Sequence, residues 1–494
     1  MPYSPTTKRH SLPRTLAFVI GAAVTGIGVS MTLAAAVSVL YREWDTALGI
    51  LGAAAITLLV GIVGWRVVGR PTPIGVREGF ATVGLAWFAL SAFGSLPYLL
   101  TGSIPNVTDA FFETASGFTT TGASVLADPS ILPHGIGMWR GLTQWVGGMG
   151  VIVLSVAILP LLGTGGVQLA RAEAPGQSPD RLTPRFRETA KRLWLLYLAF
   201  TVVQMIFLAA GDMDAYQAVV HALTTMSTGG FGTEPDSIAG FSHYTQTVIT
   251  VFMFLAGVSF ALHFRALRSP ALYLQNTEFK FFVGIIVAAV IVVAGGLLDG
   301  TRSMGTALRE AVFSVVSLVT TTGYATADFG SWRPALRILV VGLMFLGGMG
   351  GSTAGGVKTF RVGILSKAAY ADLRRLVHPR GVFAIRFGRE RVSDSVVESI
   401  QSFFLFYMFL FMTGTFVLSF IDANVSETLD LVTAASAVAS ALGNIGPGLG
   451  DVGPTSTYMA IPGVGKWMLA GLMIIGRLEI FPVLLLFTRD LWRR

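Results

Sequence analysis

Long apolar runs recur along the whole chain, and polar or charged residues separate them. Most of these runs are near the roughly 18 to 25 residues that cross about 30 Å of hydrocarbon as a helix. The runs cover 15–40, 47–65, 80–100, 137–162, 193–210, 247–262, 281–298, 334–346, 402–421 and 465–487. This pattern predicts an all-α polytopic membrane protein.

Four shorter apolar segments interrupt this series, and each ends in glycine. Aligning them places Gly122, Gly229, Gly323 and Gly446 in register, and the string "GGMG" recurs at 147–150 and 347–350 with a similar offset. Two features at one offset indicate internal repetition. The segments are 109–124, 216–232, 309–325 and 428–448. We expect four tandem units of span, short pore helix, polar turn and span.

The polar turns have a composition suited to a cation path. A short helix followed by irregular backbone at membrane depth persists only where protein buries it or water fills a cavity beside it. Turns such as "FTTTGAS" (118–124) offer carbonyl and hydroxyl oxygens, and rings of carbonyl oxygens replace the hydration shell of K⁺. Asp109, Asp214 and Asp430 lie near the helix starts, where the helix dipole favours negative charge. A single such turn fits a helix cap or a packing site equally well, but four indicate a selectivity filter.

Composition and charge narrow the class further. Of the 494 residues, 53% are hydrophobic and 13% charged, and the formal net charge is +8. If the N-terminus is cytoplasmic, roughly three quarters of the Lys and Arg fall on the cytoplasmic side, as the positive-inside rule predicts. Membrane topology thus explains the basic balance, and we expect no nucleic-acid partner. The chain has no cysteine, which excludes disulfides and thiolate chemistry. The run 15–40 is too long for a signal peptide, so we expect a retained first helix.

Two further features lie inside predicted spans. The stretch 346–358 reads "LGGMGGSTAGGVK", and glycine costs about 1 kcal/mol relative to alanine within a helix, so we expect a break there. Close packing through Gly347, Gly351 and Gly355 is the alternative. Arg477 lies in the last span, where an ionisable residue indicates function, although snorkelling to the interface is a second explanation. Glu479 does not share the helix face of Arg477, so we expect a structural partner for it.

Seven strings carry a resemblance to a known family. They are "TTTGAS" (119–124), "STGGFG" (227–232), "TTTGYA" (320–325), "GNIGPG" (443–448), "GGMGGSTAGGVK" (347–358), "EAPGQSPDRLTPRFRETAKRLW" (173–194) and "GRLEIFP" (476–482). Together they resemble the Trk/Ktr/HKT superfamily of potassium transporters, and within it the bacterial TrkH and TrkG proteins. The resemblance covers nearly the whole chain, and 15–40 and 47–65 resemble the extra N-terminal helix pair of that branch.

The resemblance implies a potassium uptake protein whose four in-chain filter segments surround one ion path. Glycine as the third filter residue of every unit is similar to the potassium-selective pattern, while the fourth unit departs from Thr-Thr-Gly. The implied K⁺-binding residues are Thr120, Thr121, Gly122, Ser227, Thr228, Gly229, Thr321, Thr322, Gly323, Asn444, Ile445 and Gly446. The implied gate is an intramembrane loop with a pore arginine, formed by Gly347, Gly348, Gly350, Gly351, Ser352, Thr353, Gly355, Gly356, Lys358 and Arg477.

The resemblance also implies surroundings and partners. We expect a homodimer in the bacterial cytoplasmic (inner) membrane, with cytoplasmic nucleotide-binding regulatory subunits of the TrkA type. The chain has no strand–GxGxxG–helix unit, so we expect it to bind no nucleotide itself. The expected division is an N-terminal two-helix unit (1–70) followed by pore repeats at 71–170, 171–270, 271–380 and 381–494.

Other classes fit less well. "GLGD" (448–451) matches the GxGD string of intramembrane aspartyl proteases, but no second mid-span aspartate accompanies Asp451, so we expect no enzyme. His134, His221 and His263 are isolated in sequence and do not form a typical metal site. An obligately H⁺- or Na⁺-coupled potassium symporter remains the alternative, although such proteins break helices in two corresponding places.

Overall fold

The computed structural model describes residues 12–67, 76–157, 183–298, 302–388, 390–422 and 429–492. The chain divides into two compact units, one of Met1–Phe111, Pro133–Trp139 and Phe481–Arg494, and one of Phe112–Leu132 and Arg140–Ile480. The predicted cytoplasmic N-terminus and residues 173–182 of the motif 173–194 lie outside the described residues.

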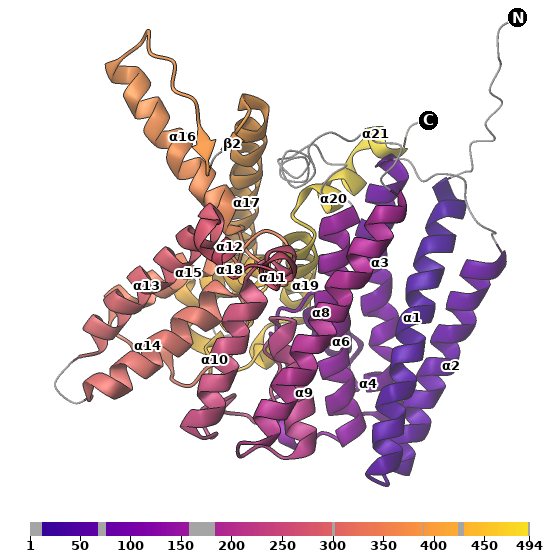
Figure 1. Cartoon of the computed structure of the whole chain (residues 1–494). Helices are drawn as coiled ribbons and strands as arrows, with labels where there is room; N and C mark the ends of the chain where they lie inside the picture. Colours follow the sequence, from indigo (N-terminus) through magenta and orange to yellow (C-terminus); the bar gives the residue numbers. More distant parts are fainter. Residues whose placement is uncertain are drawn as a thin grey trace, which may run out of the picture. The chain divides into compact units, whose positions relative to one another are not determined.

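The first unit contains the predicted N-terminal helix pair, which lies side by side in Figure 1. Glycines allow the two helices to approach closely, because a Cβ at Gly21 would lie 2.6 Å from the backbone nitrogen of Trp65. The helices of this unit are α1 (Leu12–Leu40), α2 (Trp44–Val67), α3 (Val76–Gly94), α4 (Leu96–Thr101), α20 (Phe481–Leu484), η6 (Leu485–Phe487) and α21 (Arg489–Trp492). Helices α5 (Val107–Phe118) and α6 (His134–Ala157) have residues in both units.

The second unit holds the remaining elements. One apolar core of this unit includes Phe282, Phe313 and Val340, all essentially inaccessible to solvent. Its α-helices are α8 (Thr183–Ala209), α9 (Ala215–Met226), α10 (His243–Gly257), α11 (Phe260–Ala266), α12 (Ala271–Gln275), α13 (Thr277–Leu297), α14 (Met304–Val319), α15 (Pro334–Met344), α16 (Thr359–Val377), α17 (Asp394–Asp422), α18 (Leu431–Gly443) and α19 (Gly463–Arg477). Its 3₁₀ turns are η1 (Pro129–Ile131), η3 (Phe329–Ser331), η4 (Gly450–Val452) and η5 (Tyr458–Ala460).

Six helices of the described chain are long and apolar enough to cross a membrane. Two further spans form only if bent helix pairs count as one each, namely His243–Gly257 with Phe260–Ala266 and Gly463–Arg477 with Phe481–Phe487. The all-α prediction is therefore confirmed, and a two-residue strand pair, β1 (Arg386–Phe387) with β2 (Glu390–Arg391), does not alter it.

The four predicted short helices are α5, α9, α14 and α18, with 12, 12, 16 and 13 residues. Asp214 begins α9 with a full capping box, in which its side chain accepts from the backbone N–H of Gln217. Asp109 lies in the first turn of α5, and Asp430 occupies the N-cap of α18 without a side-chain cap bond. Asp214 therefore acts as a side-chain cap, whereas Asp430 does not.

The sequence predicted one broken span, and the structure corrects this. Helices α10 and α11 meet at 99°. The chain also leaves helical geometry after Arg477, where Glu479 and Ile480 have φ of 58° and 68°. Positive φ is rare for residues with a Cβ, and most of all for β-branched ones. Arg477 is thus the last residue of α19 rather than a mid-span residue.

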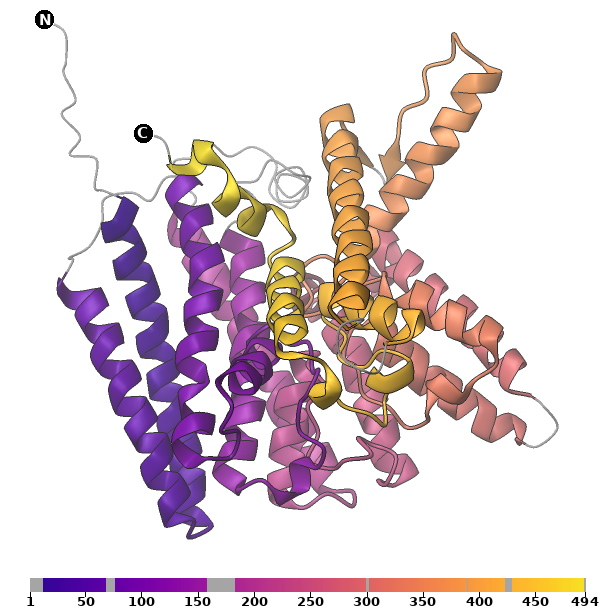
Figure 2. The ribbon, with the colours of Figure 1, turned by 180° about the vertical axis from the view of Figure 1, so that it is seen from behind.

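The charged stretch 358–391 is mostly helical. Helix α16 runs from Thr359 to Val377, and the β1–β2 pair returns the chain toward α17. In both views this hairpin projects beyond the other helices of its unit (Figures 1 and 2).

Candidate functional site

The four short helices end in the same unusual backbone turn. In each turn a left-handed residue with a Cβ is followed two positions later by a glycine of positive φ. The first residues are Thr120, Thr228, Thr321 and Asn444, with φ of 53°, 54°, 56° and 55°. The glycines are Gly122, Gly230, Gly323 and Gly446, with φ of 83°, 75°, 81° and 109°. A β-branched residue at positive φ is strained and persists only where surrounding structure enforces it. We call residues 119–122, 227–230, 320–323 and 443–446 segments 1 to 4.

This geometry corrects the sequence register of segment 2 by one residue. Gly230, not Gly229, has the positive backbone φ that Gly122 has. The hydrogen bonds support this register, because in each segment one N–H donates to the carbonyl five residues earlier. These bonds are Thr121 to Ser116, Gly229 to Thr224, Thr322 to Ser317 and Ile445 to Ser440. The predicted match failed because "STGG" has two adjacent glycines, and composition does not reveal which one has positive φ. Ser227 accordingly matches Thr119 and is the C-cap of α9.

The four segments close into a ring. The Cβ that each positive-φ glycine lacks would fall on, or close to, a carbonyl oxygen of the next segment. The pairs are Gly122 with Gly229, Gly230 with Thr322, Gly323 with Ile445, and Gly446 with Thr121. Segments 1 to 4 therefore follow one another in chain order, and segment 4 returns to segment 1.

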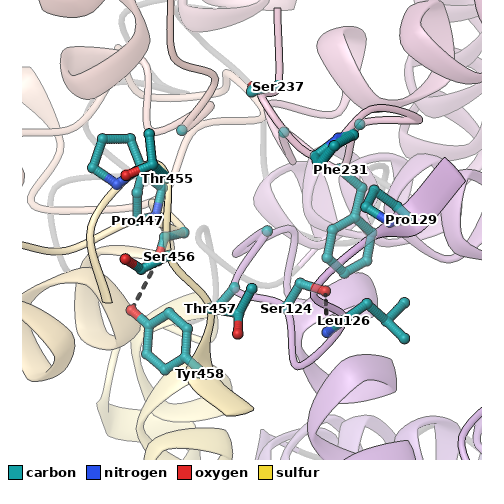
Figure 3. Close-up of a pocket in the computed structure, with 18 of the residues that line it drawn as sticks. Ser124, Leu126, Pro129, Phe231, Ser237, Pro447, Thr455, Ser456, Thr457 and Tyr458 are labelled. Carbon is teal, nitrogen blue, oxygen red and sulfur yellow. Dashed lines mark hydrogen bonds between the residues drawn. The ribbon is translucent and has the colours of Figure 1, made fainter. Parts of the chain in front are cut away.

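A cavity of about 160 Å³ lies against this ring, and all four glycines line it. Ser124 and Phe231 face Pro447 and Tyr458 across it in Figure 3. The hydroxyl of Tyr458 donates to the carbonyl of Gly446 at 2.8 Å, which fixes the backbone of segment 4. The cavity lining combines the four ring glycines with hydroxyl-bearing side chains such as Ser124, Thr457 and Tyr458.

The predicted break in the third unit is an ordered loop between α15 and α16. We call residues 345–358 the glycine loop. Its two ends pair, since Gly347 N–H donates to the carbonyl of Val357 at 2.9 Å and Val357 N–H to that of Phe345 at 3.1 Å. Gly351 and Gly356 have φ of 78° and 63°, which explains why glycine occupies these positions.

The glycine loop contacts three of the four pore units. Gly355 N–H donates to the hydroxyl of Thr321 at 2.7 Å. A Cβ on Gly355 would overlap the carbonyl of Gly443. The hydroxyl of Thr353 lies 3.1 Å from the carbonyl of Met226, at the end of α9. The glycine loop therefore packs against the C-terminal ends of the short helices α9, α14 and α18, from which the ring segments continue.

Arg477 lies against this loop as a buried cation. It is 3% exposed, and its Nη1 donates to the carbonyl of Thr353 at 2.7 Å. Its Nε and Nη2 have no hydrogen-bond partner among the described residues. Unpaired buried donors on a cation are costly, so this arrangement indicates a role other than stability. The predicted juxtaposition of Arg477 with the loop is present.

Charged side chains bind the glycine loop or lie beside it. Glu278, at the start of α13, accepts from Gly350 N–H at 2.7 Å. Lys358 donates to the carbonyl of Ala354 within the loop. Arg361 and Glu479 form an ion pair, so Glu479 has the structural partner that the sequence predicted. Glu278 was missed, and only its place in the first turn of an apolar helix distinguishes it in the sequence.

The other predicted gate residues also lie in the loop, but they contact different neighbours. A Cβ on Gly348 would lie 2.7 Å from the carbonyl of Gly257, and one on Gly351 3.1 Å from the hydroxyl of Ser259. The hydroxyl of Ser352 donates to the carbonyl of Met349 at 2.6 Å. Gly348 and Gly351 therefore lie against the α10–α11 break, and the Ser352 hydrogen bond lies within the loop.

An ion pair that the sequence analysis missed lies behind segments 1 and 2. Arg140 on α6 and Glu113 on α5 are 2.8 Å apart, and the Glu113 side chain is wholly buried. Glu113 also accepts from Val125 N–H at 3.0 Å, after segment 1. Arg140 donates to the carbonyl of Gly232 at 3.2 Å, after segment 2. The pair thus links the chain that leaves segment 1 with the chain that leaves segment 2.

Replacing Glu113 by glutamine should destabilise the protein, because it leaves the Arg140 cation buried without its counter-charge. Breaking a buried pair in this way costs about 3–5 kcal/mol, which for a chain of this size corresponds to a loss of roughly 4 °C in melting temperature. Thermal unfolding of the purified protein in detergent measures the effect.

The matched control is the exposed pair of Arg375 and Asp372, 2.8 Å apart. Asp372→Asn should change the melting temperature little, since such surface pairs contribute about 0–1 kcal/mol. Equal melting temperatures for the two variants would contradict a structural role for Glu113.

Comparisons with known proteins agree with one another. A family profile described as TrkH, cation transport protein, matches residues 50–493. The chain is 37% identical over 489 residues to the Trk system potassium uptake protein TrkH of Salmonella typhimurium, covering 97% of this chain and 99% of that protein. It is 33% identical over 424 residues to TrkG of Escherichia coli K12, covering 84% and 86%. The crystal structure of the potassium transporter TrkH from Vibrio parahaemolyticus matches with a TM-score of 0.88 and 36% identity, covering 97% and 99%.

Proposed function

The chain belongs to the TrkH family of cation transport proteins, and on that premise we propose that it takes up potassium ions across the cytoplasmic membrane. Both relatives described above are named potassium uptake proteins of the Trk system. The multi-pass helical architecture fits this activity. The matched family is one of cation transport proteins, so the proposal includes transport and no enzymatic step.

The closed ring of segments 1 to 4 is the observation that carries the proposal. Its glycines line the cavity, and each lies against a carbonyl oxygen of the next segment. Carbonyl oxygens arranged in rings replace the water around K⁺. With the corrected register, the proposed filter residues are Thr120–Gly122, Thr228–Gly230, Thr321–Gly323 and Asn444–Gly446.

The glycine loop and Arg477 form the proposed gate, beside the ends of the short helices. Gly355 contacts Thr321 of the ring, and Thr353 contacts Arg477. A positive charge there raises the barrier to a passing cation. Opening would then require the loop to leave the ends of the short helices and Arg477 to move or to be neutralised.

Family membership and charge support a proposal for the wider assembly. We propose a homodimer in the bacterial inner membrane, with the N-terminus in the cytoplasm. TrkA-type regulatory subunits would bind on the cytoplasmic face, where the projecting α16 hairpin carries Lys367, Arg374 and Arg375. The proposed division keeps residues 1–70 as an additional unit before pore repeats at 71–170, 171–270, 271–380 and 381–494.

Ion flux through the purified protein in liposomes tests the function. We expect passive K⁺ and Rb⁺ passage with little Na⁺ at zero membrane potential and without a pH gradient. Flux that appears only with a proton or sodium gradient would instead establish the obligately coupled symporter. Absence of flux under every gradient, even with a TrkA-type partner added, would overturn the proposal. Protein-free liposomes are the control.

A further inference from the structure

Segment 2 lacks a side-chain contact that stiffens segments 1 and 3. In segment 1 the hydroxyls of Thr119 and Thr121 are 2.7 Å apart. In segment 3 those of Thr320 and Thr322 are 2.8 Å apart. Each pair joins the end of a short helix to the residue before the glycine. Segment 2 has glycine, Gly229, where the other two have this threonine.

The side chain of Gln144, from helix α6, occupies the place of the missing threonine. A Cβ added to Gly229 would overlap the Gln144 amide. The amide Nε2 donates to the carbonyl of Gly229 at 2.7 Å, and its Oε1 accepts from Phe231 N–H at 3.1 Å. Only this orientation of the amide satisfies both backbone groups. Gln144 itself is completely buried.

Gln144 makes segment 2 chemically different from the other three. The carbonyls equivalent to that of Gly229 belong to Thr121, Thr322 and Ile445. Within the described ranges, none of these three accepts a hydrogen bond, whereas the Gly229 carbonyl does. Among these four equivalent carbonyls, that of Gly229 is therefore held by a side chain from outside the segments.

A second residue on the same face of α6 supports the same stretch of chain. Arg140 lies four residues before Gln144, one helical turn away. Its guanidinium stacks 4.1 Å from the centre of the Phe231 ring and donates to the carbonyl of Gly232. Arg140 and Gln144 together thus contact residues 229, 231 and 232.

We propose that Gln144 is a specificity-determining positioning residue, which holds segment 2 at the width that selects K⁺ over Na⁺. The proposal rests on the proposed function of the ring as a potassium filter. Selectivity needs carbonyl oxygens held at a set distance from the ion, and glycine permits more backbone motion than any other residue. Gln144 supplies from outside the segment the restraint that threonine supplies within segments 1 and 3.

The first test replaces Gln144 by leucine, which keeps the approximate size but removes both hydrogen bonds. We expect the ratio of K⁺ to Na⁺ flux in liposomes to fall about tenfold, the factor that corresponds to about 1.4 kcal/mol, with total cation flux retained. The matched control is Gln246→Leu on α10. Gln246 is also buried, but it donates to the carbonyl of Phe241 at 3.0 Å, outside the ring. Its loss should leave the ratio unchanged.

A swap experiment separates a specific role from general packing. Gly229→Thr alone should impair flux, because the new side chain would overlap the Gln144 amide. In the double variant with Gln144→Ala, the shorter alanine leaves space for the threonine side chain at position 229. The introduced hydroxyl would then face Ser227 as Thr121 faces Thr119. We expect the double variant to recover most of the K⁺ selectivity that Gln144→Ala loses.

The outcomes distinguish this inference from the proposed function. Wild-type protein without selective K⁺ flux would remove the function itself. Selective wild-type protein together with a folded, equally selective Gln144→Leu variant would overturn the inference. If Gln144→Leu does not fold, the test depends on the double variant Gly229→Thr with Gln144→Ala. A folded double variant that selects K⁺ supports the proposal, and a folded double variant with a low K⁺ to Na⁺ ratio overturns it.

Discussion

Replacing Gly230 by alanine is expected to lower K⁺ flux about a hundredfold and to remove the preference for K⁺ over Na⁺. Gly230 has a φ of 75°, which alanine adopts only with strain of about 1 kcal/mol or more. The added Cβ would also overlap the carbonyl oxygen of Thr322 in segment 3. Because the ring is closed, displacing this oxygen disturbs the opening for the ion on two sides. Flux of K⁺, Rb⁺ and Na⁺ into liposomes measures both effects.

Gly232→Ala is the matched control, two residues further along the same chain. Gly232 has no positive φ, and a Cβ there would lie 3.6 Å from its nearest neighbour, an ordinary contact. We expect wild-type flux and selectivity. Gly446→Ala should be milder than Gly230→Ala, since its Cβ would lie 2.7 Å from the oxygen of Thr121. Unchanged selectivity in Gly230→Ala would contradict the register that places this glycine in the ring.

Much of the ring was predictable from the sequence, because its signal is local and occurs four times. A short apolar helix followed by threonine and glycine is a recognisable unit, and its repetition indicated that the units face each other. What local composition did not reveal was the register of segment 2. Gly229 and Gly230 are the same residue type, and only the backbone around Thr228 and Gly230 distinguishes them.

The "GGMG" strings show why repeated sequence is not repeated structure. Residues 147–150 lie within the continuous helix α6, where a Cβ on Gly147 would overlap the carbonyl of Phe118 at the end of α5. Residues 347–350 lie in the glycine loop instead. The second string is followed by further glycines, of which Gly351 and Gly356 have positive φ. The same four residues therefore serve close helix packing in one place and an irregular turn in the other.

The breaks and buried charges depend on distant residues, which explains why the sequence analysis missed them. Helix α10 ends where the carbonyl of Gly257 accepts from Met349 N–H at 2.9 Å. Helix α11 begins where the N–H of Phe260 donates to the carbonyl of Gly351 at 3.0 Å. The glycine loop thus satisfies backbone groups that a break leaves free. Glu278 likewise meets its partner Gly350 across 72 residues, a distance at which neither residue indicates the other in the sequence.

Replacing Arg477 by glutamine is expected to raise K⁺ flux at least about tenfold while leaving the K⁺ to Na⁺ ratio unchanged. Two unit charges about 4 Å apart repel by about 4 kcal/mol at an effective dielectric constant of about 20. Removing about a third of such a barrier already accounts for a tenfold increase in the rate of ion passage. The ring is untouched, because the described contact of Arg477 is with Thr353 of the glycine loop. Liposome flux without a regulatory subunit is the measurement.

Two companion variants decide how Arg477 acts. Arg477→Lys retains the charge, so flux should stay near the wild-type value if the barrier is electrostatic. Thr353→Val removes the hydroxyl that reaches the carbonyls of Met226 and Ala256, at 3.1 and 3.2 Å, but keeps the charge of Arg477. If Arg477→Lys and Thr353→Val both conduct as strongly as Arg477→Gln, then the position of the glycine loop determines the barrier to cation passage, and the charge of Arg477 does not. A fall in flux or a loss of selectivity in Arg477→Gln would place this residue in support of the ring and not in the gate.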